Sequence, residues 1–406
     1  MRVAWIVVEV HATAFSGNFG MNATQARHLP LFRVRVLELG TMITAPYAAM
    51  MLAELGAKVI KIENPDGGDP FRATVTGRYG PNFVAYNHSK RSLTLDLKTD
   101  AGKATFRKLL LISDVLIENY RSGVMEKFGF GWEVIQDLNP RLIYCSITGF
   151  GTTGPYRDRP AYDAVASALS GVYGLAVEPA NPRLVGVTIS DNATGMYAVN
   201  GILSALYERE RTRQGRRIEV NMLESAIAFT PDAFAHYTQG NTTYGPQSRV
   251  ASSQCFAFMC SDKKLLAVHL SLQNKFWDNF MKVIEEPAIA SDKRFKERAG
   301  RVANYGELNA AIAKVVVKRT RTFWMVRLEQ FDVPFAPIHT IPMVLADPQV
   351  AHLGTFCEAN HPIQGRVVTI RSPIRVDGAR SDNKPPPMLG EHNAEILKEL
   401  PEGDGS

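Results

Sequence analysis

The segment 34–63 constrains the fold more than any other part of the chain. Residues 34–39, VRVLEL, are typical of a short buried strand, and a second strand is predicted over residues 58–63. Between them, residues 46–55 predict a helix, which Gly56 ends. A strand, a helix and a second strand in close succession form a βαβ unit, which implies a parallel sheet and a right-handed crossover. We therefore expect an α/β chain with a parallel sheet.

The turn after the first strand limits the choice of cofactor. Residues 40–46 read GTMITAP and lack the G-x-G-x-x-G spacing that lets a pyrophosphate approach the backbone. The fold prediction stays Rossmann-like, but an NAD-dependent dehydrogenase loses most of its support. The four cysteines form no CxxC pair and have no histidine nearby at metal-ligand spacing. We expect reduced thiols, no metal and no permanently bound cofactor.

Length and charge bound the organisation and the partners. The chain has 406 residues, which suggests two domains, and its 45% hydrophobic and 21% charged residues are ordinary for a soluble globular enzyme. The net charge of +6 is spread in short pieces such as Lys90-Arg91 and residues 209–217. This pattern favours a solvated mixed surface over a nucleic-acid-binding stripe. Because no stretch approaches the ~20 apolar residues of a membrane span, no membrane partner is expected.

The chain changes character after residue 225. Strands are predicted over 255–259 and 265–269 and a helix from Asn274 onward, which suits a smaller α+β domain with Phe256, Phe258, Phe276 and Trp277 in its core. The predicted units are an N-terminal extension (1–30), the first part of a large domain (31–225), the small domain (226–330) and the return to the large domain (331–406).

The first thirty residues raise the question of a secretory signal. An apolar run at 4–8 follows Arg2, and Ala12-Thr13-Ala14 has the form of a cleavage site. Glu9 and His11 interrupt that run, however. A disordered extension, or a true start at Met21, fits better.

Asp191 stands where an apolar run ending at Ile189 meets a predicted helix. One interpretation is structural, because aspartate is a preferred N-cap that accepts hydrogen bonds from the first turn. The other is functional, because the donors of a helix start can hold a carboxylate ionised, and an ionised carboxylate can attack an acyl carbon. The spacing alone does not choose between them.

Several long stretches resemble one family. They are residues 37–72, 87–98, 115–135, 143–171, 186–224 and 385–397, which include LELGTMITAPYAAMMLAELGAKVIKIE, NHSKRSLTLDLK and PPPMLGEHNAEIL. In order and spacing they are similar to the CaiB/BaiF family, the class III CoA-transferases, from about residue 30 to the C-terminus. The run AYDAVASALSG most resembles enzymes that use dicarboxylates such as succinate, glutarate or hydroxymethylglutarate.

The resemblance implies an activity and an assembly. The family's transferases (EC 2.8.3.-) move coenzyme A from an acyl-CoA thioester to a carboxylic acid, with acyl-CoA as a substrate. Their nucleophile matches Asp191, which would form a mixed anhydride and then an aspartyl-CoA thioester. The resemblance also implies an interlocked homodimer of two-domain chains and a cytoplasmic location.

The same resemblance assigns further site residues. Asp163 matches an acidic residue that lines the family's active site, with Asp191 as the other catalytic candidate. Asn119, Tyr120 and Arg121 follow a predicted strand at 114–118, at the edge where ligands of open α/β sheets bind. The expected contacts to coenzyme A are Lys98, Asn119, Tyr120, Arg121 and Lys127, and the candidate substrate residues are Arg159, Tyr162 and Glu224. Glu224 would either assist the chemistry or cap a helix.

Two alternatives stay open. Racemases of the family have histidine where this chain has Tyr162, and a tyrosine with a pKa near 10 exchanges protons poorly, which favours transfer over racemisation of a 2-methylacyl-CoA. A non-catalytic CoA-binding protein is the other alternative. The chain also departs from the family in two places. It has Asn64 where the family often has a basic residue for the nucleotide. Many transferases of the family carry a glycine-rich loop early in the small domain, whereas the loop GPQSRVASS (245–253) has a single glycine.

Overall fold

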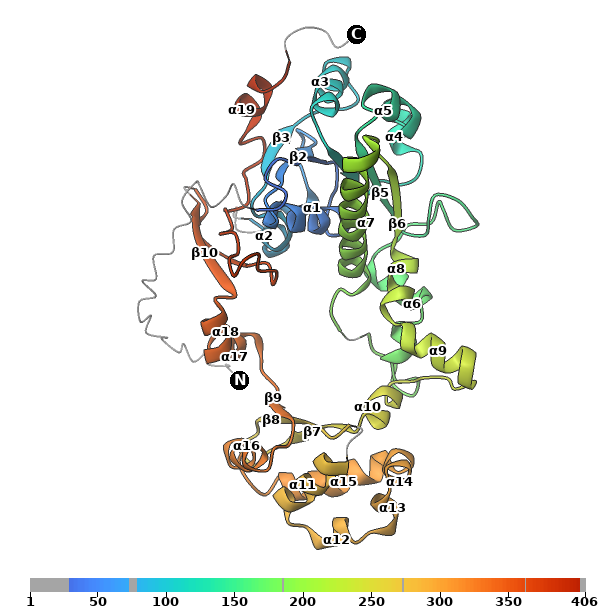
Figure 1. Cartoon of the computed structure of the whole chain (residues 1–406), viewed down its shortest axis with the longest axis vertical. Coiled ribbons are helices and arrows are strands. Elements are labelled where there is room, and N and C mark those ends of the chain that lie inside the picture. Colours follow the sequence, from blue (N-terminus) through green and yellow to red (C-terminus); the bar gives the residue numbers. More distant parts are fainter. Residues whose placement is uncertain (1–28, 73–78, 185, 272–273, 362, 402–406) are drawn as a thin grey trace, which may run out of the picture.

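The computed structural model describes residues 29–72, 79–184, 186–271, 274–361 and 363–401. The extension predicted over residues 1–30 falls almost entirely outside these ranges. The chain forms a large body and a smaller body, and two separate connections join them (Figure 1).

A six-stranded parallel sheet forms the centre of the large body. Its order is β3-β2-β1-β4-β5-β6, which is the order of a doubly wound dinucleotide-binding sheet. The βαβ unit predicted over 34–63 is confirmed as β1 (Arg35–Glu38), α1 (Thr44–Glu54) and β2 (Lys58–Glu63), with β1 and β2 parallel. The other strands are β3 (Arg91–Thr94), β4 (Val115–Glu118), β5 (Ile143–Thr148) and β6 (Arg217–Asn221).

Helices cover both faces of this sheet. Besides α1, the helices of the large body are α2 (Pro81–Asn87), α3 (Asp100–Leu111), α4 (Val124–Phe128), α5 (Trp132–Leu138), α6 (Asp163–Leu169), α7 (Ser190–Thr212), α8 (Met222–Phe229) and α19 (Asn393–Lys398). On one face α1 and α7 pack against Val36, Val115 and Ile143. On the other face α3, α4 and α5 pack against alternate strand residues such as Leu37, Leu116 and Tyr144. Alternation along each strand thus fills two separate cores.

The helices α1 and α7 approach each other closely at Gly195. A Cβ atom at this position would lie 2.9 Å from the Tyr47 ring and 3.1 Å from the Thr44 carbonyl oxygen. Glycine therefore permits the contact that sets the start of α7 against the start of α1.

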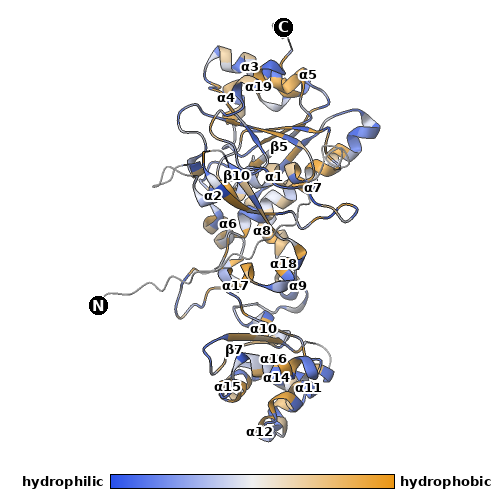
Figure 2. Ribbon diagram, turned by 90° about the vertical axis from the view of Figure 1, so that its left-hand side faces the viewer, coloured by the Kyte–Doolittle hydropathy of each residue, from blue (hydrophilic) through white to orange (hydrophobic). Residues whose placement is uncertain are grey.

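The smaller body has its own core. Its antiparallel sheet, β7 (Cys255–Met259), β8 (Leu265–His269) and β9 (Phe335–Pro337), packs on helices α11 (Asn274–Ile284), α12 (Pro287–Ala290), α13 (Lys293–Lys296), α14 (Arg298–Ala303), α15 (Tyr305–Val316) and α16 (Arg321–Gln330). Both strands predicted here are confirmed, and Phe256, Phe258 and Trp277 are buried in the core. Because β9 pairs with β8, this sheet includes residues beyond 330, the position at which the sequence predicted the end of the small domain. Figure 2 shows hydrophobic stretches along the sheets of both bodies.

The connections between the bodies run on opposite sides (Figure 1). One contains α9 (Pro231–Gly240) and α10 (Ser248–Ser252), so much of the loop GPQSRVASS is helical. The other contains α17 (Ile341–Leu345) and α18 (Pro348–Leu353), followed by the hairpin β10 (Phe356–His361) and β11 (Gly365–Ile370). No helix in the described parts of the chain has the length and apolar character that a membrane span requires.

Four charged side chains are buried together in the large body, and one of them, Lys90, was predicted at the surface. Lys90 was expected on a solvated surface, but its side chain is fully buried beside Glu38, with 2.7 Å between Nζ and Oε2. Lys61 Nζ lies 2.7 Å from Glu38 Oε1 and 2.9 Å from Asp69 Oδ2, and all of these side chains are inaccessible to solvent. Their mutual pairing offsets the cost of removing four charges from water. We call Glu38, Lys61, Asp69 and Lys90 the buried charge cluster.

Candidate active site

The loop after β1 is held in one position from two sides. Asn119, just past β4, accepts a hydrogen bond from the Thr41 N–H at 3.0 Å and donates to the Thr44 hydroxyl at 2.9 Å. The Met42 N–H donates to Asp69 of the buried charge cluster at 3.2 Å, and Met42 has a φ of 64°. A non-glycine residue in this left-handed conformation needs such support. The buried charge cluster thereby fixes the backbone at the carboxyl edge of the sheet.

Asp191 lies in the first turn of α7, and its own side chain does not cap that helix. The cap comes from α6 instead, because Asp163 Oδ1 accepts a hydrogen bond from the Asp191 N–H at 3.2 Å. The structural interpretation of Asp191 as an N-cap is therefore wrong. Its carboxyl group is left to line a pocket.

Burial and, to a lesser extent, the nearby charge of Asp163 together raise the pKa of Asp191 from 3.8 to about 7. A carboxyl group withdrawn from water favours its neutral form, and a like charge adds to that preference. Near neutral pH, Asp191 therefore exists in both protonation states. Strongly shifted groups in a pocket are frequent at functional sites.

The pocket beside Asp191, which we call the Asp191 pocket, has a volume of about 320 Å³. Six residues singled out in the sequence line it, namely Asn119, Tyr120, Arg121, Arg159, Tyr162 and Asp191. The first three follow the end of β4, Arg159 and Tyr162 belong to the segment between β5 and α6, and Asp191 lies in the first turn of α7, so the packing of these elements brings the six residues together. The charged lining residues are three arginines, Arg121, Arg157 and Arg159, and one acid, Asp191. This balance suits an anionic ligand.

The remaining predicted residues lie outside that lining. Lys98 and Lys127 are exposed and line neither this pocket nor its neighbour. Glu224 is also exposed, and its N–H donates to Asn221 Oδ1 at 2.8 Å while its carboxylate accepts from the Asn221 amide. Asn221 is therefore the residue that caps α8, and the Glu224 carboxylate contacts the side chain of that cap.

Sequence reasoning missed Tyr86 and Arg157. The Tyr86 hydroxyl donates to Asn192 Oδ1 at 3.4 Å, next to Asp191, and its ring meets Tyr47 edge to face at 5.7 Å between centroids. Burial raises the pKa of Tyr86, and the charge of Asp191 contributes. Tyr86 reaches the site because α2 packs on α1, so no local signal could have identified it. Arg157 lies in the Gly/Thr/Pro-rich segment 149–160 that follows β5, and its charge was the available signal.

The described residues contain no group of three or more His, Cys, Asp or Glu side chains that could hold a metal ion. All four cysteines, which lie in the described ranges, are free thiols. The site therefore offers carboxyl, hydroxyl and guanidinium groups for chemistry.

Comparison with known proteins gives consistent results. Residues 31–393 match the family described as CoA-transferase family III. The human succinyl-CoA:glutarate CoA-transferase is 33% identical over 388 residues, which cover 91% of this chain and 86% of that protein. The succinate–glutarate CoA-transferase of Agrobacterium fabrum is 34% identical, with 92% and 96% of the two chains covered. A CAIB/BAIF family protein from Brucella suis has a solved structure with a TM-score of 0.81 and 32% identity, covering 92% of this chain and 99% of that one.

Proposed function

Because the chain belongs to CoA-transferase family III, we propose that it transfers coenzyme A from an acyl-CoA thioester to a carboxylic acid, with Asp191 as the nucleophile. One observation carries the proposal: the Asp191 carboxyl group is not used as a helix cap and lines a pocket with three arginines. The alternative of a racemase gains no support, because the named relatives are CoA-transferases.

The proposed reaction is an exchange without oxidation or reduction. The Asp191 carboxylate attacks the thioester carbonyl, the C–S bond breaks, and a mixed anhydride and CoA thiolate form. The thiolate attacks the aspartyl carbonyl, which releases the donor acid and leaves an aspartyl-CoA thioester. The acceptor carboxylate then attacks that thioester, and the returning thiolate takes the new acyl group from the second anhydride. Free Asp191 and a new acyl-CoA result.

Asp163 has a positioning role in this proposal. Its bond to the Asp191 N–H fixes the first turn of α7. Its charge also helps keep the pKa of Asp191 near 7, where the carboxylate is both available and reactive.

We assign the substrates by charge. Coenzyme A would lie along the turn of Asn119, Tyr120 and Arg121, with Lys98 and Lys127 nearer its phosphates. The human relative is named for succinate and glutarate, and the Asp191 pocket has more arginines than acids. A dicarboxylate with its distal carboxylate on Arg159 or Arg157 fits this balance, because guanidinium groups bind carboxylates in two-point contacts.

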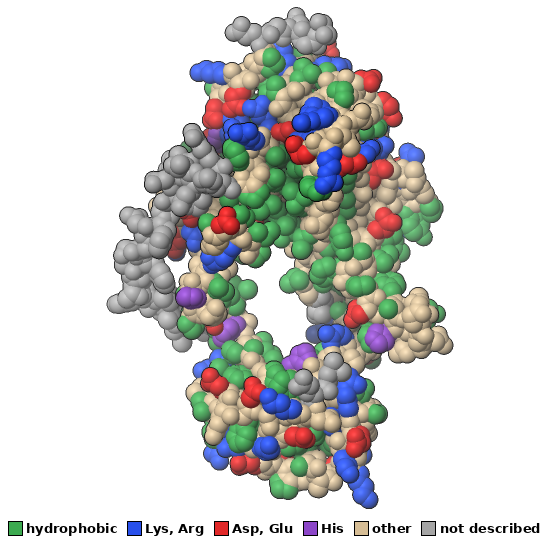
Figure 3. All heavy atoms as spheres, in the orientation of Figure 1, with side chains coloured by type: hydrophobic (Ala, Val, Ile, Leu, Met, Phe, Trp, Pro, Cys, Tyr) green, Lys and Arg blue, Asp and Glu red, His purple; other side chains and the backbone are tan. Residues whose placement is uncertain are grey.

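A homodimer fits the surface. The molecule has an opening between its two bodies, and hydrophobic side chains border it (Figure 3). Large exposed apolar residues lie on the connections and on α7 and α8, including Met196, Tyr197, Phe229, Tyr237, Ile338 and Ile341. Exposed apolar surface of this extent marks an interface. Sedimentation velocity should give twice the mass of one chain, and a stable monomer at micromolar concentration would contradict the interlocked dimer.

The nucleophile is tested by intact-protein mass spectrometry. The chain is incubated with succinyl-CoA, treated with hydroxylamine and digested. We expect a covalent mark on the peptide that contains Asp191, absent from Asp191→Ala and retained in Asp137→Ala, which removes an exposed carboxylate on α5. If no acyl-CoA in a panel marks Asp191, the proposed mechanism fails. Deuterium uptake from solvent at the α-carbon would then favour racemisation.

A further inference from the structure

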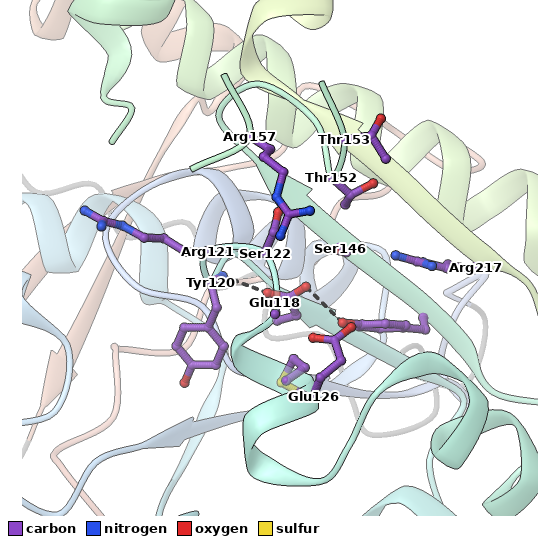
Figure 4. A pocket seen from close by; sticks show the side chains of 13 residues that line it. Glu118, Tyr120, Arg121, Ser122, Glu126, Ser146, Thr152, Thr153, Arg157 and Arg217 are labelled. Carbon is purple, nitrogen blue, oxygen red and sulfur yellow. Dashed lines mark hydrogen bonds between the residues drawn. The ribbon is translucent and has the colours of Figure 1, made fainter. Parts of the chain in front are cut away.

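A second pocket adjoins the Asp191 pocket. It has a volume of about 380 Å³, and it shares Tyr120, Arg121 and Arg157 with the Asp191 pocket. We call it the Arg217 pocket, after a residue that lines it and not its neighbour. It lies beside Glu118 at the end of β4 and extends over Tyr144 and Ser146 of β5 to Arg217, the first residue of β6 (Figure 4).

Two arginines face this pocket from opposite sides. Arg157 extends toward Glu118 from the loop that follows β5, and Arg217 points inward from β6 (Figure 4). The Arg121 side chain points away from these two arginines. Arg157 pairs with its neighbour Asp158 at 3.3 Å, and both side chains are more than half exposed. Arg217 pairs with Glu219 at 2.9 Å, with about a third of its side chain exposed. Such exposed pairs are weak, so both guanidinium groups can accept another anion.

The floor of the pocket contains polar groups that are incompletely used. Glu118 is buried and accepts hydrogen bonds from the Tyr120 N–H at 2.7 Å and from the Tyr144 hydroxyl at 3.0 Å. Burial raises its pKa to about 7, so Glu118 carries less negative charge than an ordinary carboxylate. The Ser122 hydroxyl is enclosed and has no hydrogen-bond partner among the described residues. An enclosed hydroxyl without a partner is costly, so Ser122 has a free donor for an acceptor that comes within reach.

Coenzyme-A exchange creates a need for a second acid position. In the proposed reaction CoA stays attached to Asp191 while one carboxylic acid leaves and another enters. The CoA chain and the aspartyl thioester then occupy the Asp191 pocket, so the free acid needs an adjacent place that neutralises its charge. The Arg217 pocket is adjacent and shares Arg157 with the Asp191 pocket.

We propose that the Arg217 pocket binds the free dicarboxylic acid before and after it reacts, between Arg157 and Arg217 with the Ser122 hydroxyl as a further donor. Arg157 contacts both pockets and would pass the acid from one to the other. Glu126 also lines the pocket, but it forms no ion pair with an arginine within the part of the chain that the structure describes, so the acid would compete only with Asp158 and Glu219 for the two guanidinium groups. This role rests on the proposed transferase function, but the binding itself does not.

The first test measures binding without turnover. The full chain with Asp191→Ala is saturated with CoA and titrated with succinate by calorimetry. Arg217→Gln is expected to weaken succinate binding at least ~10-fold, as removal of a charged hydrogen-bond donor typically does. Arg216→Gln is the matched control, because it removes the same charge one residue away, where the arginine is exposed and paired with Glu208. Equal affinity in the two variants, or no succinate binding, would overturn the proposal.

A second variant separates a ligand contact from a structural role. Ser122→Ala removes a hydroxyl that has no protein partner, so it should leave the melting temperature unchanged or raise it. It should nevertheless weaken succinate binding about 3- to 10-fold if the hydroxyl contacts the acid. Unchanged affinity would exclude Ser122 from the site, and would leave the proposal contradicted if Arg217→Gln also has no effect.

Kinetics of the chain with Asp191 intact then connect the pocket to turnover. Arg217→Gln should raise KM for the acceptor acid, while the rate of Asp191 marking by succinyl-CoA in a single turnover stays unchanged. A matching loss in the marking rate would overturn the assignment to the free acid. If Asp191 is never marked but succinate binding still depends on Arg217, the transferase mechanism fails and the anion site remains.

Discussion

Asp191→Asn is expected to lower turnover by at least about 10³-fold and to raise the free energy of unfolding at pH 8 by about 2 kcal/mol. Asparagine is close to aspartate in shape but cannot form the anhydride, so the covalent route is lost. Asparagine also places no buried charge beside Asp163, whose carboxylate accepts a hydrogen bond from the backbone N–H of residue 191. Loss of function and gain of stability at one position is the expected mark of a strained active-site charge.

The stability gain depends on pH in a defined direction. The pKa of Asp191 is 3.8 in an exposed chain and about 7 in the folded protein, where burial and then Asp163 raise it. Between these values the folded state binds more protons than the unfolded state, so the natural chain loses stability as pH rises. The advantage of asparagine is therefore full above about pH 7 and absent below about pH 4. Because the carboxyl group is partly exposed, solvent screening reduces this gain in the free energy of unfolding, and we expect about 2 kcal/mol.

Urea unfolding at pH 8 and pH 4 measures this difference, with Asp137→Asn as the control, since that carboxylate is exposed on α5. For the natural chain, kcat/KM for the acyl-CoA should rise with pH and level off above about 7, because the ionised carboxyl group is the nucleophile. A variant with asparagine that keeps normal turnover, or that gains no stability at pH 8, would show that Asp191 is not a buried nucleophile.

Lys61→Met is expected to destabilise the protein by about 3–5 kcal/mol, the largest effect we predict on stability. Burial alone would lower the pKa of Lys61, but Glu38 and Asp69 outweigh it and hold that pKa above its usual value. Methionine has a similar length but leaves both carboxylates buried with less compensation. Asp69 also accepts the Met42 N–H, so the loop beside the Asp191 pocket should loosen as well.

Urea unfolding at pH 7 tests this effect against Arg366→Met. Arg366 pairs with Glu358 on the surface hairpin, and both side chains are more than half exposed. The loss of that pair should cost less than about 1 kcal/mol, because water and salt screen it. Similar losses in the two variants would mean that the buried charge cluster contributes no more than a surface pair.

Much of the scaffold could be predicted because it depends on short-range patterns. The βαβ unit at 34–63 and the strands at 255–259 and 265–269 follow from apolar periodicity and glycine punctuation. The position of Asn119, Tyr120 and Arg121 also followed, because a residue that ends a parallel strand lies at the ligand-binding edge wherever that strand is placed in the sheet.

Periodicity could not predict contacts between distant segments. Lys61 reads as an ordinary strand residue and Lys90 as part of a surface charge run, yet both are buried against Glu38. The strand β9 is only three residues long and is recognisable by its pairing with β8. Short polar or irregular segments have weak local preferences, so packing decides where they lie.

The sequence by itself determined the α/β scaffold, the family resemblance and Asp191 as the candidate nucleophile. Only the tertiary structure decided how Asp191 is used, because Asp163, 28 residues earlier, caps α7 and leaves the Asp191 carboxyl group to line the pocket. It also brought Tyr86 beside Asn192 and set Arg157 between two pockets. Local sequence fixes which elements form, whereas pKa values and pocket linings depend on side chains that meet only when those elements pack.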